Sequence, residues 1–313
     1  MNEQDTNTTP RTTTNTTTTR RQRLPTRPAP ADSSTLSWFQ LPQSLRRVFD
    51  RFPLVAYPPS PLPQRAPRHQ NEHILYVFQS EEPACRDAPS FNPSCLKWQA
   101  YLKFHGIPLR TRSSNNHASP TGSLPFLLPA SKDLQRPASP VPSNRIARWV
   151  VSQGGKEEAV HIKQEAYTAL IDHTIRSAWL HYLYLDHDNF HAVAWPMYVS
   201  SASNSYPIQT SLAYQLQNAA RDELLKTNTV VDAQELYAKA DKAFQSLSTL
   251  LGDNKFFFAQ STPGLFDASL FAYTQIILDD QLDWKSTALK LVLQNHDNLV
   301  RHRARLIRGF FSS

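Results

Sequence analysis

Two places in the sequence carry side chains whose type and spacing suit catalysis or metal binding. Ser94 and Cys95 stand at the expected start of a helix, and a helix N-terminus lowers the pKa of a thiol. A thiol or hydroxyl placed there is a candidate nucleophile. His187, Asp188 and His191 read H-D-x-x-H, the spacing with which two histidines on one helix can hold zinc.

Both places also have a structural interpretation, and the neighbouring residues favour it. Cys95 falls on the same helical face as Trp98 and Leu102, which predicts a small buried hydrophobe in place of a nucleophile. In the H-D-x-x-H pattern the acid is usually Glu, whose longer side chain reaches a metal-bound water. We therefore expect the two histidines to cap or line a loop, and we expect no catalytic residue, cofactor or metal site.

The elements that must position these residues fall into two halves of different periodicity. In residues 71–155, short apolar runs typical of buried strands alternate with helices. Ser94 and Ser143 are expected to cap the helices, and Gly106 to end the first of them. Strands are expected at residues 74–78, 107–112 and 124–128, and helices at 95–105 and from 143 to the glycine pair 154–155. This order of elements is that of a thioredoxin-like α/β domain.

The second half, residues 156–313, reads as helix almost throughout. Asp232 with Glu235 three residues later is a capping pair that opens the clearest helix, and Gly252 ends it. Further helices are expected at residues 165–185, 265–278 and 286–308. A thioredoxin-like domain followed by an all-helical domain is the glutathione-transferase plan, and this is the fold class we expect.

The net charge of +7 is concentrated in the first 70 residues. They hold 10 Lys and Arg against 4 acidic residues, whereas residues 71–313 hold 23 against 22. A nearly neutral body argues against a nucleic-acid groove. The sequence has no run of about 18 apolar residues to span a membrane, and no glycine pattern of a phosphate-binding loop. Two cysteines without a hydrophobic leader indicate a reducing, cytosolic setting.

Residues 1–70 are rich in Thr, Arg and Pro, and we expect them to be disordered because they offer little apolar surface to bury. Within them, residues 44–52 form a short amphipathic segment that either folds back on its own domain or docks on a partner or a membrane. The candidate partner-binding side chains are apolar and lie in and just before this segment: Trp38, Phe39, Leu41, Leu45, Val48 and Phe49.

Basic residues gather again near the C-terminus, where they alternate with apolar residues such as Leu306. The set comprises Lys285, Lys290, Arg301, Arg303, Arg305 and Arg308. One interpretation is a solvated helix face. The other is attraction to anionic lipid head groups, which contributes about 1 kcal/mol per basic residue near the surface.

Several stretches of the body resemble the metaxins. Residues 94–104 (SCLKWQAYLKF) resemble the first helix of that family, and residues 114–122 (SNNHASPTG) resemble its SN…SPxG loop. Residues 124–127 look like the strand that follows the loop, and residues 256–258 with 262–268 look like the signature of its helical domain. The similarity covers about residues 74–278, and the chain looks closer to the second metaxin and its fungal counterpart than to the first metaxin.

The resemblance implies a function at the mitochondrial outer membrane. Metaxins are subunits of the sorting and assembly machinery, so the chain is expected on the cytosolic face, where it helps to recognise and insert β-barrel precursors. The implied partners are the barrel-forming core subunit, a second metaxin-type subunit and the precursors themselves. A membrane surface is a further candidate partner, through the basic C-terminal helix; nucleic acid is not.

Two other functions stay open on the sequence. One is a glutathione-dependent transferase or reductase that uses Cys95 or Ser94. Against it, residues 142–144 (PSN) stand where such enzymes hold the γ-glutamyl group, and no carboxylate is nearby. The other is a scaffold with a transferase fold and an unrelated partner.

Two further residues relate to the expected fold. Pro125 matches the proline that is cis in such folds, and Gly264 stands where the family commonly has a Ser or Thr cap, three residues before Asp267.

Overall fold

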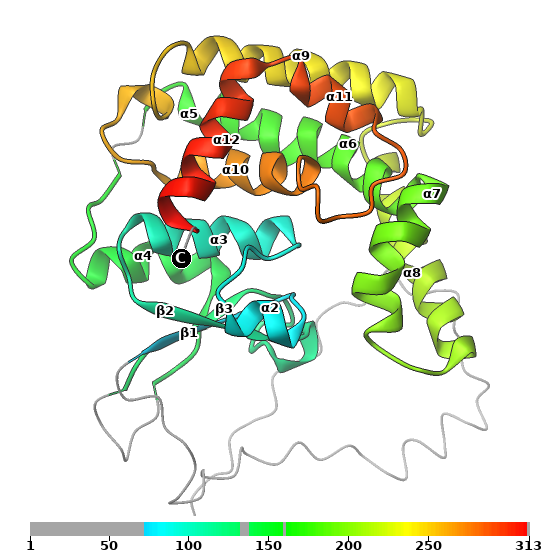
Figure 1. Ribbon diagram of the computed structural model, residues 1–313, viewed down its shortest axis with the longest axis horizontal. Coiled ribbons are helices and arrows are strands. Elements are labelled where there is room, and N and C mark those ends of the chain that lie inside the picture. The colour runs from blue at the N-terminus through cyan, green and yellow to red at the C-terminus, as the bar shows by residue number, and fades with distance from the viewer. Residues whose placement is uncertain (1–71, 132–137, 159–160, 312–313) are drawn as a thin grey trace, which may run out of the picture. The chain divides into compact units, whose positions relative to one another are not determined.

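The computed structural model describes residues 72–131, 138–158 and 161–311. These residues are drawn in colour in Figure 1. The expected disordered tail, the amphipathic segment 44–52 and the six candidate partner-binding residues from Trp38 to Phe49 lie outside this part of the chain.

A mixed four-stranded sheet forms the centre of the first half. Its strands are β1 (His73–Val77), β2 (Leu109–Ser113), β3 (Phe126–Leu128) and β4 (Val141–Pro142), in the order β2-β1-β3-β4. β1 runs parallel to β2 and antiparallel to β3, and β3 runs antiparallel to β4. The apolar runs thus form β1 and β3 as predicted. The sequence pattern did not reveal β4, because two residues that include a proline give no strand signal.

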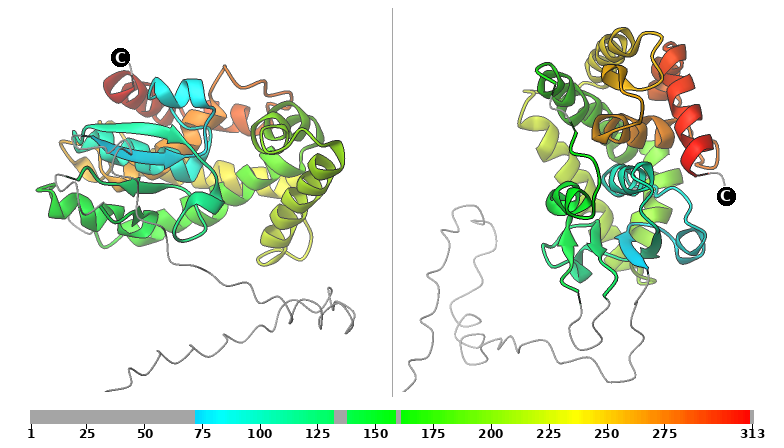
Figure 2. Two further views of the ribbon diagram at one scale, coloured as in Figure 1. Left: turned by 90° about the horizontal axis from the view of Figure 1, so that it is seen from below. Right: turned by 90° about the vertical axis from the view of Figure 1, so that its left-hand side faces the viewer.

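Three helices accompany the sheet: α2 (Glu81–Cys85), α3 (Pro93–Phe104) and α4 (Ser143–Ser152). A single turn of 3₁₀ helix, η1 (Asn116–Ala118), precedes β3. Figure 2 shows α3 and α4 side by side over the sheet. The predicted end of α3 is confirmed, because Gly106 adopts the left-handed φ of 64° that glycine tolerates best.

Both predicted N-caps of this half were wrong. The cap of α3 is Asn92, whose side chain accepts a hydrogen bond from the backbone N of Cys95 at 3.2 Å, so Ser94 lies inside the first turn. α4 begins at Ser143 itself and has no side-chain cap. The reason is the sheet: Pro142 still pairs with Phe126, so the helix must start at the next residue.

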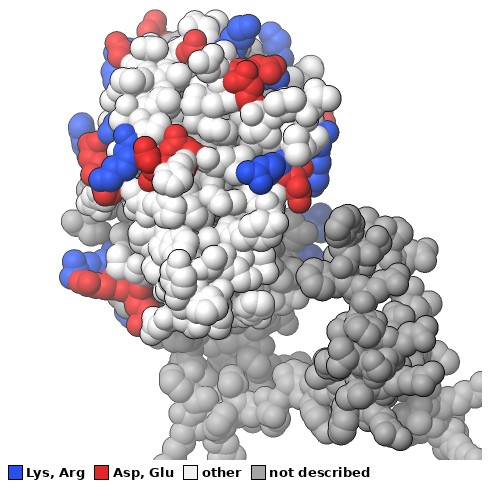
Figure 3. All heavy atoms as spheres, turned by 90° about the vertical axis from the view of Figure 1, so that its right-hand side faces the viewer, with Lys and Arg blue, Asp and Glu red and all other residues white. Residues whose placement is uncertain are grey.

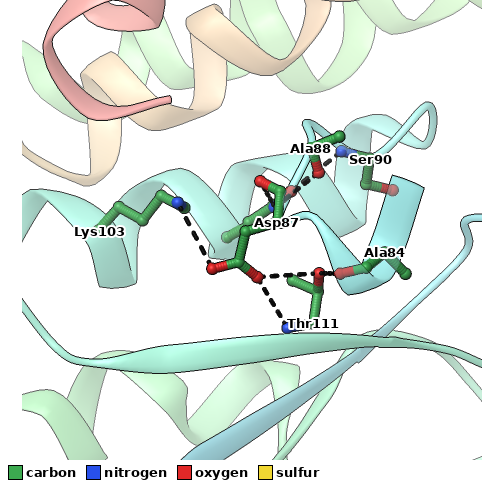
Figure 4. Close-up of polar contacts among 7 residues, drawn as sticks. Ala84, Asp87, Ala88, Ser90, Lys103 and Thr111 are labelled. Carbon is green, nitrogen blue, oxygen red and sulfur yellow. Dashed lines mark hydrogen bonds and ion pairs between the residues drawn. The ribbon is translucent and has the colours of Figure 1, made fainter. Parts of the chain in front are cut away.

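Helix α2 and Asp87 cover the outer edge of β2, where Thr111 is buried (Figure 4). Oδ1 of Asp87 accepts hydrogen bonds from the backbone N of Thr111 at 3.0 Å and from its hydroxyl at 3.1 Å. The same carboxylate lies 3.8 Å from the ammonium of Lys103 on α3. An edge strand with free N–H groups invites pairing with other chains, and a carboxylate on the edge removes that possibility at Thr111.

The second half is helical. Its elements are α5 (Gln164–Ala169), η2 (Leu170–Ile175), α6 (Arg176–Leu180), η3 (His181–Leu185), α7 (His187–Asn189), η4 (Phe190–Ser200), α8 (Tyr206–Leu225), α9 (Ala233–Leu251), η5 (Phe257–Ala259), α10 (Leu265–Ile277), α11 (Ala288–Gln294) and α12 (Asp297–Phe310). The segments η2, η3 and η4 are π-helical. The side chain of Asp232 caps α9 as predicted, accepting hydrogen bonds from the backbone N of Gln234 and Glu235.

The predicted final helix is two helices, which corrects the expectation of one continuous helix over residues 286–308. The chain turns between α11 and α12 at His296, whose buried ring lies 3.0 Å from the carboxylate of Asp241 on α9. This contact between distant residues holds the chain at the break.

The core lies where the two halves meet. α3 packs against α10, and eleven of the thirteen residues of α10 are buried. Figure 1 shows α3 between the sheet and the layer that holds α10. The structure therefore has the glutathione-transferase-like plan expected from the sequence, an α/β part followed by a helical part. Within the described residues, no helix combines the length and apolar character needed to cross a bilayer.

Candidate functional site

The two candidate nucleophiles, Ser94 and Cys95, lie in different environments. Cys95 is fully buried, its Sγ accepts a hydrogen bond from the backbone N of Phe78 at 3.4 Å, and burial raises its pKa to about 12. The interpretation as a buried small hydrophobe is confirmed by this complete burial. Ser94 is exposed on a hollow of about 380 Å³, which Lys97 and Arg176 also line.

The histidine pair does not assemble a metal centre. His187 is exposed at the start of α7, and its Nδ1 lies 3.2 Å from the carboxylate of Asp188. The ring of His191 lies 4.8 Å from that of His187, centroid to centroid. Across the part of the chain that the structure describes, no group of three or more His, Cys, Asp or Glu side chains could hold a metal ion.

A groove of about 860 Å³ lies at the carboxyl ends of β1 and β2. Its floor is aromatic. The ring centroid of Tyr198, on η4, lies 5.7 Å from that of Phe78, which follows β1, and 5.3 Å from that of Phe91, which precedes α3. One wall is apolar and comes from η4 and α8, with Pro196, Met197, Leu212 and Leu216. The opposite rim is the polar loop from Ser113 to His117. The first residues of the metaxin-like loop therefore border this groove.

Local hydrogen bonds hold the polar rim in place. The backbone N of Ser114 donates to the carbonyl of Val77 at 3.0 Å, which continues the β1–β2 pairing into the loop. Asn115 caps η1, and Oδ1 of Asn116 accepts a hydrogen bond from the backbone N of Leu124 at 3.0 Å. Leu124 precedes Pro125 across a cis peptide bond, which agrees with the match of Pro125 to the cis proline of transferase-like folds. The two asparagines of the motif thus have a defined structural role, which is to shape the rim.

The side chain of Asn92 connects the floor of the groove to the start of α3. Asn92, the cap of α3, also donates from Nδ2 to the hydroxyl of Tyr198 at 3.2 Å. Burial raises the pKa of Tyr198 well above its usual value, so the phenol stays neutral. Among the described residues that line the groove, Glu81 is the one carboxylate and His117 the one imidazole. The apolar and aromatic part of the lining suits binding.

Sequence reasoning found the rim of the groove and missed its wall. The sequence does carry a signal for the wall: residues 192–220, which cover most of η4 and most of α8, contain no Asp, Glu, Lys, Arg or His. A run of 29 uncharged residues is unusual in a chain in which 19% of residues are charged. Because these residues are not apolar throughout, they give no membrane or strand signal, and their pattern predicts only ordinary helix.

The basic residues near the C-terminus are only partly free. Lys285 pairs with Asp283 and Lys290 with Asp280, each at 2.7 Å. Arg303 donates to the side-chain oxygen of Gln275 at 2.7 Å. The remaining three, Arg301, Arg305 and Arg308, are exposed on α12 and line a hollow of about 390 Å³. Two of them donate to backbone carbonyls, Arg305 to Lys255 at 2.5 Å and Arg301 to Asp297 at 3.4 Å.

The chain is similar in sequence to two domain families and to several metaxins. The glutathione S-transferase N-terminal domain family matches residues 93–189, and the glutathione S-transferase C-terminal domain family matches residues 240–306. Metaxin-3 of Xenopus laevis is 29% identical over 243 residues, which cover 72% of this chain and 74% of the relative. Metaxin-1 of Macaca fascicularis is 26% identical over 235 residues, 71% of each chain.

A plant relative and a solved structure extend the comparison. The Arabidopsis thaliana protein named "Mitochondrial outer membrane import complex protein METAXIN" is 24% identical over 252 residues, which cover 77% of this chain and 75% of the relative. The structure of glutathione S-transferase III in its apo form aligns with 75% of this chain and 91% of its own, at 13% identity and a TM-score of 0.44.

Proposed function

The chain belongs to the metaxin family and has a glutathione-transferase-like fold, and from this premise we propose that it is a subunit of the sorting and assembly machinery of the mitochondrial outer membrane. In this proposal it sits peripherally on the cytosolic face and helps to recognise and insert β-barrel precursors. The observation that carries the proposal is the similarity to metaxins over more than 70% of the chain, including a relative named as a mitochondrial outer-membrane import complex protein.

The proposed role is not enzymatic. It is supported by the state of Cys95, which is buried and held protonated by its raised pKa, and so is poorly suited to thiol chemistry. The rival function is a glutathione-dependent transferase or reductase. The one observation in its favour is that Ser94 is exposed on a hollow. Retention on glutathione resin, with activity lost in Ser94→Ala, would favour the rival. Absence of retention and of activity would remove it.

The proposed partners follow from the same role. They are the barrel-forming core subunit, a second metaxin-type subunit and the β-barrel precursors. A membrane surface is a further proposed partner, and the exposed arginines of α12 support it. The particular likeness to the second metaxin and its fungal counterpart stays a prediction, because the two animal relatives compared are metaxin-3 and metaxin-1.

Depletion of the protein tests the proposal. Mitochondria isolated after depletion should assemble newly imported porin more slowly into its mature complex on native gels, while import of a matrix-targeted precursor should proceed at the normal rate. Normal porin assembly would refute the proposed role. Affinity purification in mild detergent separates this role from that of an unrelated scaffold, because only the proposed role requires a barrel-forming membrane protein to co-purify.

A further inference from the structure

The hollow of about 380 Å³ beside Ser94 lies where α3 meets the helical half of the protein. On α3, Ser94 and Lys97 are three positions apart, and on α10, Ser269 and Tyr273 are four apart, so each helix turns a single face toward the hollow. The volume is within the range of about 300–1,000 Å³ that is usual for small-molecule sites. The lining consists of Pro93, Ser94 and Lys97 on α3, Asp172 and His173 on η2, Arg176 on α6, Glu223 on α8, and Ser269 and Tyr273 on α10.

Two of the four charged side chains in the hollow are already paired, and two are not. Arg176 donates to the carboxylate of Glu223 at 2.8 Å. Lys97 and Asp172 form no hydrogen bond or ion pair with any residue that the structure describes, and they do not pair with each other. The hollow therefore presents one uncommitted positive charge and one uncommitted negative charge.

Lys97 is the one of these two groups that burial deprives of water. Its side chain is half-buried and burial lowers its pKa, whereas Asp172 is exposed. The ring centroid of Trp98 lies 5.6 Å from Nζ of Lys97, and this contact compensates only in part for the lost water. On the face drawn in Figure 3, by contrast, most Lys and Arg side chains lie next to Asp or Glu side chains. A partly buried cation without a carboxylate beside it favours an anionic group of a ligand.

Neutral donors line the hollow together with Lys97. The hydroxyl of Ser94 is exposed, and neither it nor the hydroxyl of Tyr273 forms a hydrogen bond with a described residue. The backbone N–H of Ser94, in the first turn of α3, likewise has no acceptor among the described residues. A carboxylate offers two acceptor oxygens, so it matches an ammonium group that is accompanied by such donors.

The acidic side chains of the hollow limit the charge of the ligand. Because Asp172 and Glu223 share the hollow with Lys97, a phosphate with two negative charges would be repelled, whereas an ammonium group would be attracted to Asp172. We propose that the hollow binds a small amino acid, with its carboxylate on Lys97 and its ammonium group on Asp172. None of residues 142–144, which stand where transferases hold the γ-glutamyl group, lines this hollow.

Nuclear magnetic resonance on the full chain at pH 7.5 tests this site. The indole N–H signal of Trp98, assigned with Trp98→Phe, reports on the hollow because this ring lies beside Lys97. The probes are glycine, β-alanine and γ-aminobutyrate, each with the counterpart that lacks the amino group, which is acetate, propionate or butyrate. At least one amino acid should bind at least fivefold more tightly than its counterpart, and inorganic phosphate should bind more weakly than that amino acid. Absence of binding, equal binding within every pair, or tighter binding of phosphate would overturn the proposal.

Two variants separate the two contacts. Lys97→Met keeps the length of the side chain and removes its charge, so it should weaken binding of the amino acid at least tenfold. Asp172→Asn should bring the affinities of the amino acid and its counterpart within twofold of each other, and because Asp172 is exposed this change leaves the fold intact.

The matched control is Lys290→Met on α11. The side chain of Lys290 is also partly buried, at 21% exposure, but it is already paired with Asp280 at 2.7 Å. This variant should bind the amino acid as the wild type does, and circular dichroism should show the same fold in all three variants. A loss of binding in the control equal to that in Lys97→Met would contradict the site.

Glutathione, which also carries carboxylate and ammonium groups, gives a different result if the hollow is a transferase site. It would then bind at least tenfold more tightly than every amino acid tested, and Ser94→Ala would abolish its binding. That outcome would overturn the assignment to a small amino acid, whereas glutathione binding no tighter than that of the amino acid agrees with it. These readouts do not depend on porin assembly, so the amino-acid site and the proposed function can fail separately.

Discussion

The side chain of His302 on α12 meets that of Asp267 on α10, with 2.8 Å between Nε2 and Oδ1 and with both side chains almost completely buried. Asp267 is a local organiser as well, because it accepts hydrogen bonds from the backbone N of Gly264 at 3.0 Å and of Phe257 at 3.1 Å. One carboxylate thus joins the start of α10, the turn η5 and the last helix.

Removal of this carboxylate should be strongly destabilising. Asp267→Ala leaves three donors without an acceptor in the core, and breaking a buried pair from one side costs about 3–5 kcal/mol. Denaturation in urea should show a loss of this size in the free energy of unfolding. The control Asp283→Ala, which removes an exposed partner of Lys285, should change it by less than about 1 kcal/mol. A loss below about 1 kcal/mol in Asp267→Ala would contradict the assignment.

The start of α10 is completed by Glu158, far away in the sequence. Its Oε1 accepts a hydrogen bond from the backbone N of Leu265 at 2.8 Å, and a Cβ on Gly264 would lie 2.9 Å from its Oε2. Gly264→Ser should therefore displace Glu158 and lower the free energy of unfolding by about 1 kcal/mol, the usual value of one cap. In a Glu158→Ala background the same serine has room to cap the helix and should stabilise instead. An equal effect in both backgrounds, measured in urea, would show that the two side chains do not compete.

Burial of Cys95 predicts both its reactivity and a pH dependence. In a Cys85→Ser background, Cys95 should react with iodoacetamide at pH 8 only as fast as the protein unfolds. Burial raises its pKa from 9.0 to about 12, so above pH 9 the unfolded chain loses a proton that the native state keeps. The free energy of unfolding should therefore fall between pH 9 and pH 12, at up to about 1.4 kcal/mol per pH unit, relative to Cys95→Ala. Rapid labelling of the native protein would count against a buried thiol.

The amphipathic segment 44–52 gives a prediction that lies outside the described residues. Leu45→Asp, Val48→Asp and Phe49→Asp together should weaken association with the complex, because they remove the apolar face that would dock. The thermal midpoint of the body should stay unchanged. Co-purification from mitochondria measures the association, with Arg46→Gln and Arg47→Gln as a variant that leaves the apolar face intact. Unaltered co-purification of the triple variant would refute the docking role.

Sequence patterns succeeded where the deciding contacts lie within a few residues. Asp232 caps α9 through backbone groups two and three positions later, and Gly106 ends α3 through its own φ angle. The local signal still misplaced the cap of α3, because Ser94 and Asn92 are both capping residues and only the backbone geometry chooses between them. The family resemblance likewise rested on contiguous motifs, which is why it could be read from the chain.

By itself, then, the sequence determined strands β1, β2 and β3, helices α3, α4, α9 and α10, the two-part plan and the family resemblance, since each depends on local propensity or on contiguous motifs. Only the tertiary structure decided which side chains meet. Asn92 reaches Tyr198 across 106 residues, Glu158 reaches Leu265 across 107, and His296 breaks the last helix through Asp241. The groove arises in the same way. The uncharged run of residues 192–220 that supplies its wall is visible in the sequence, but only packing brings η4 and α8 to the ends of β1 and β2 and so forms the hollow.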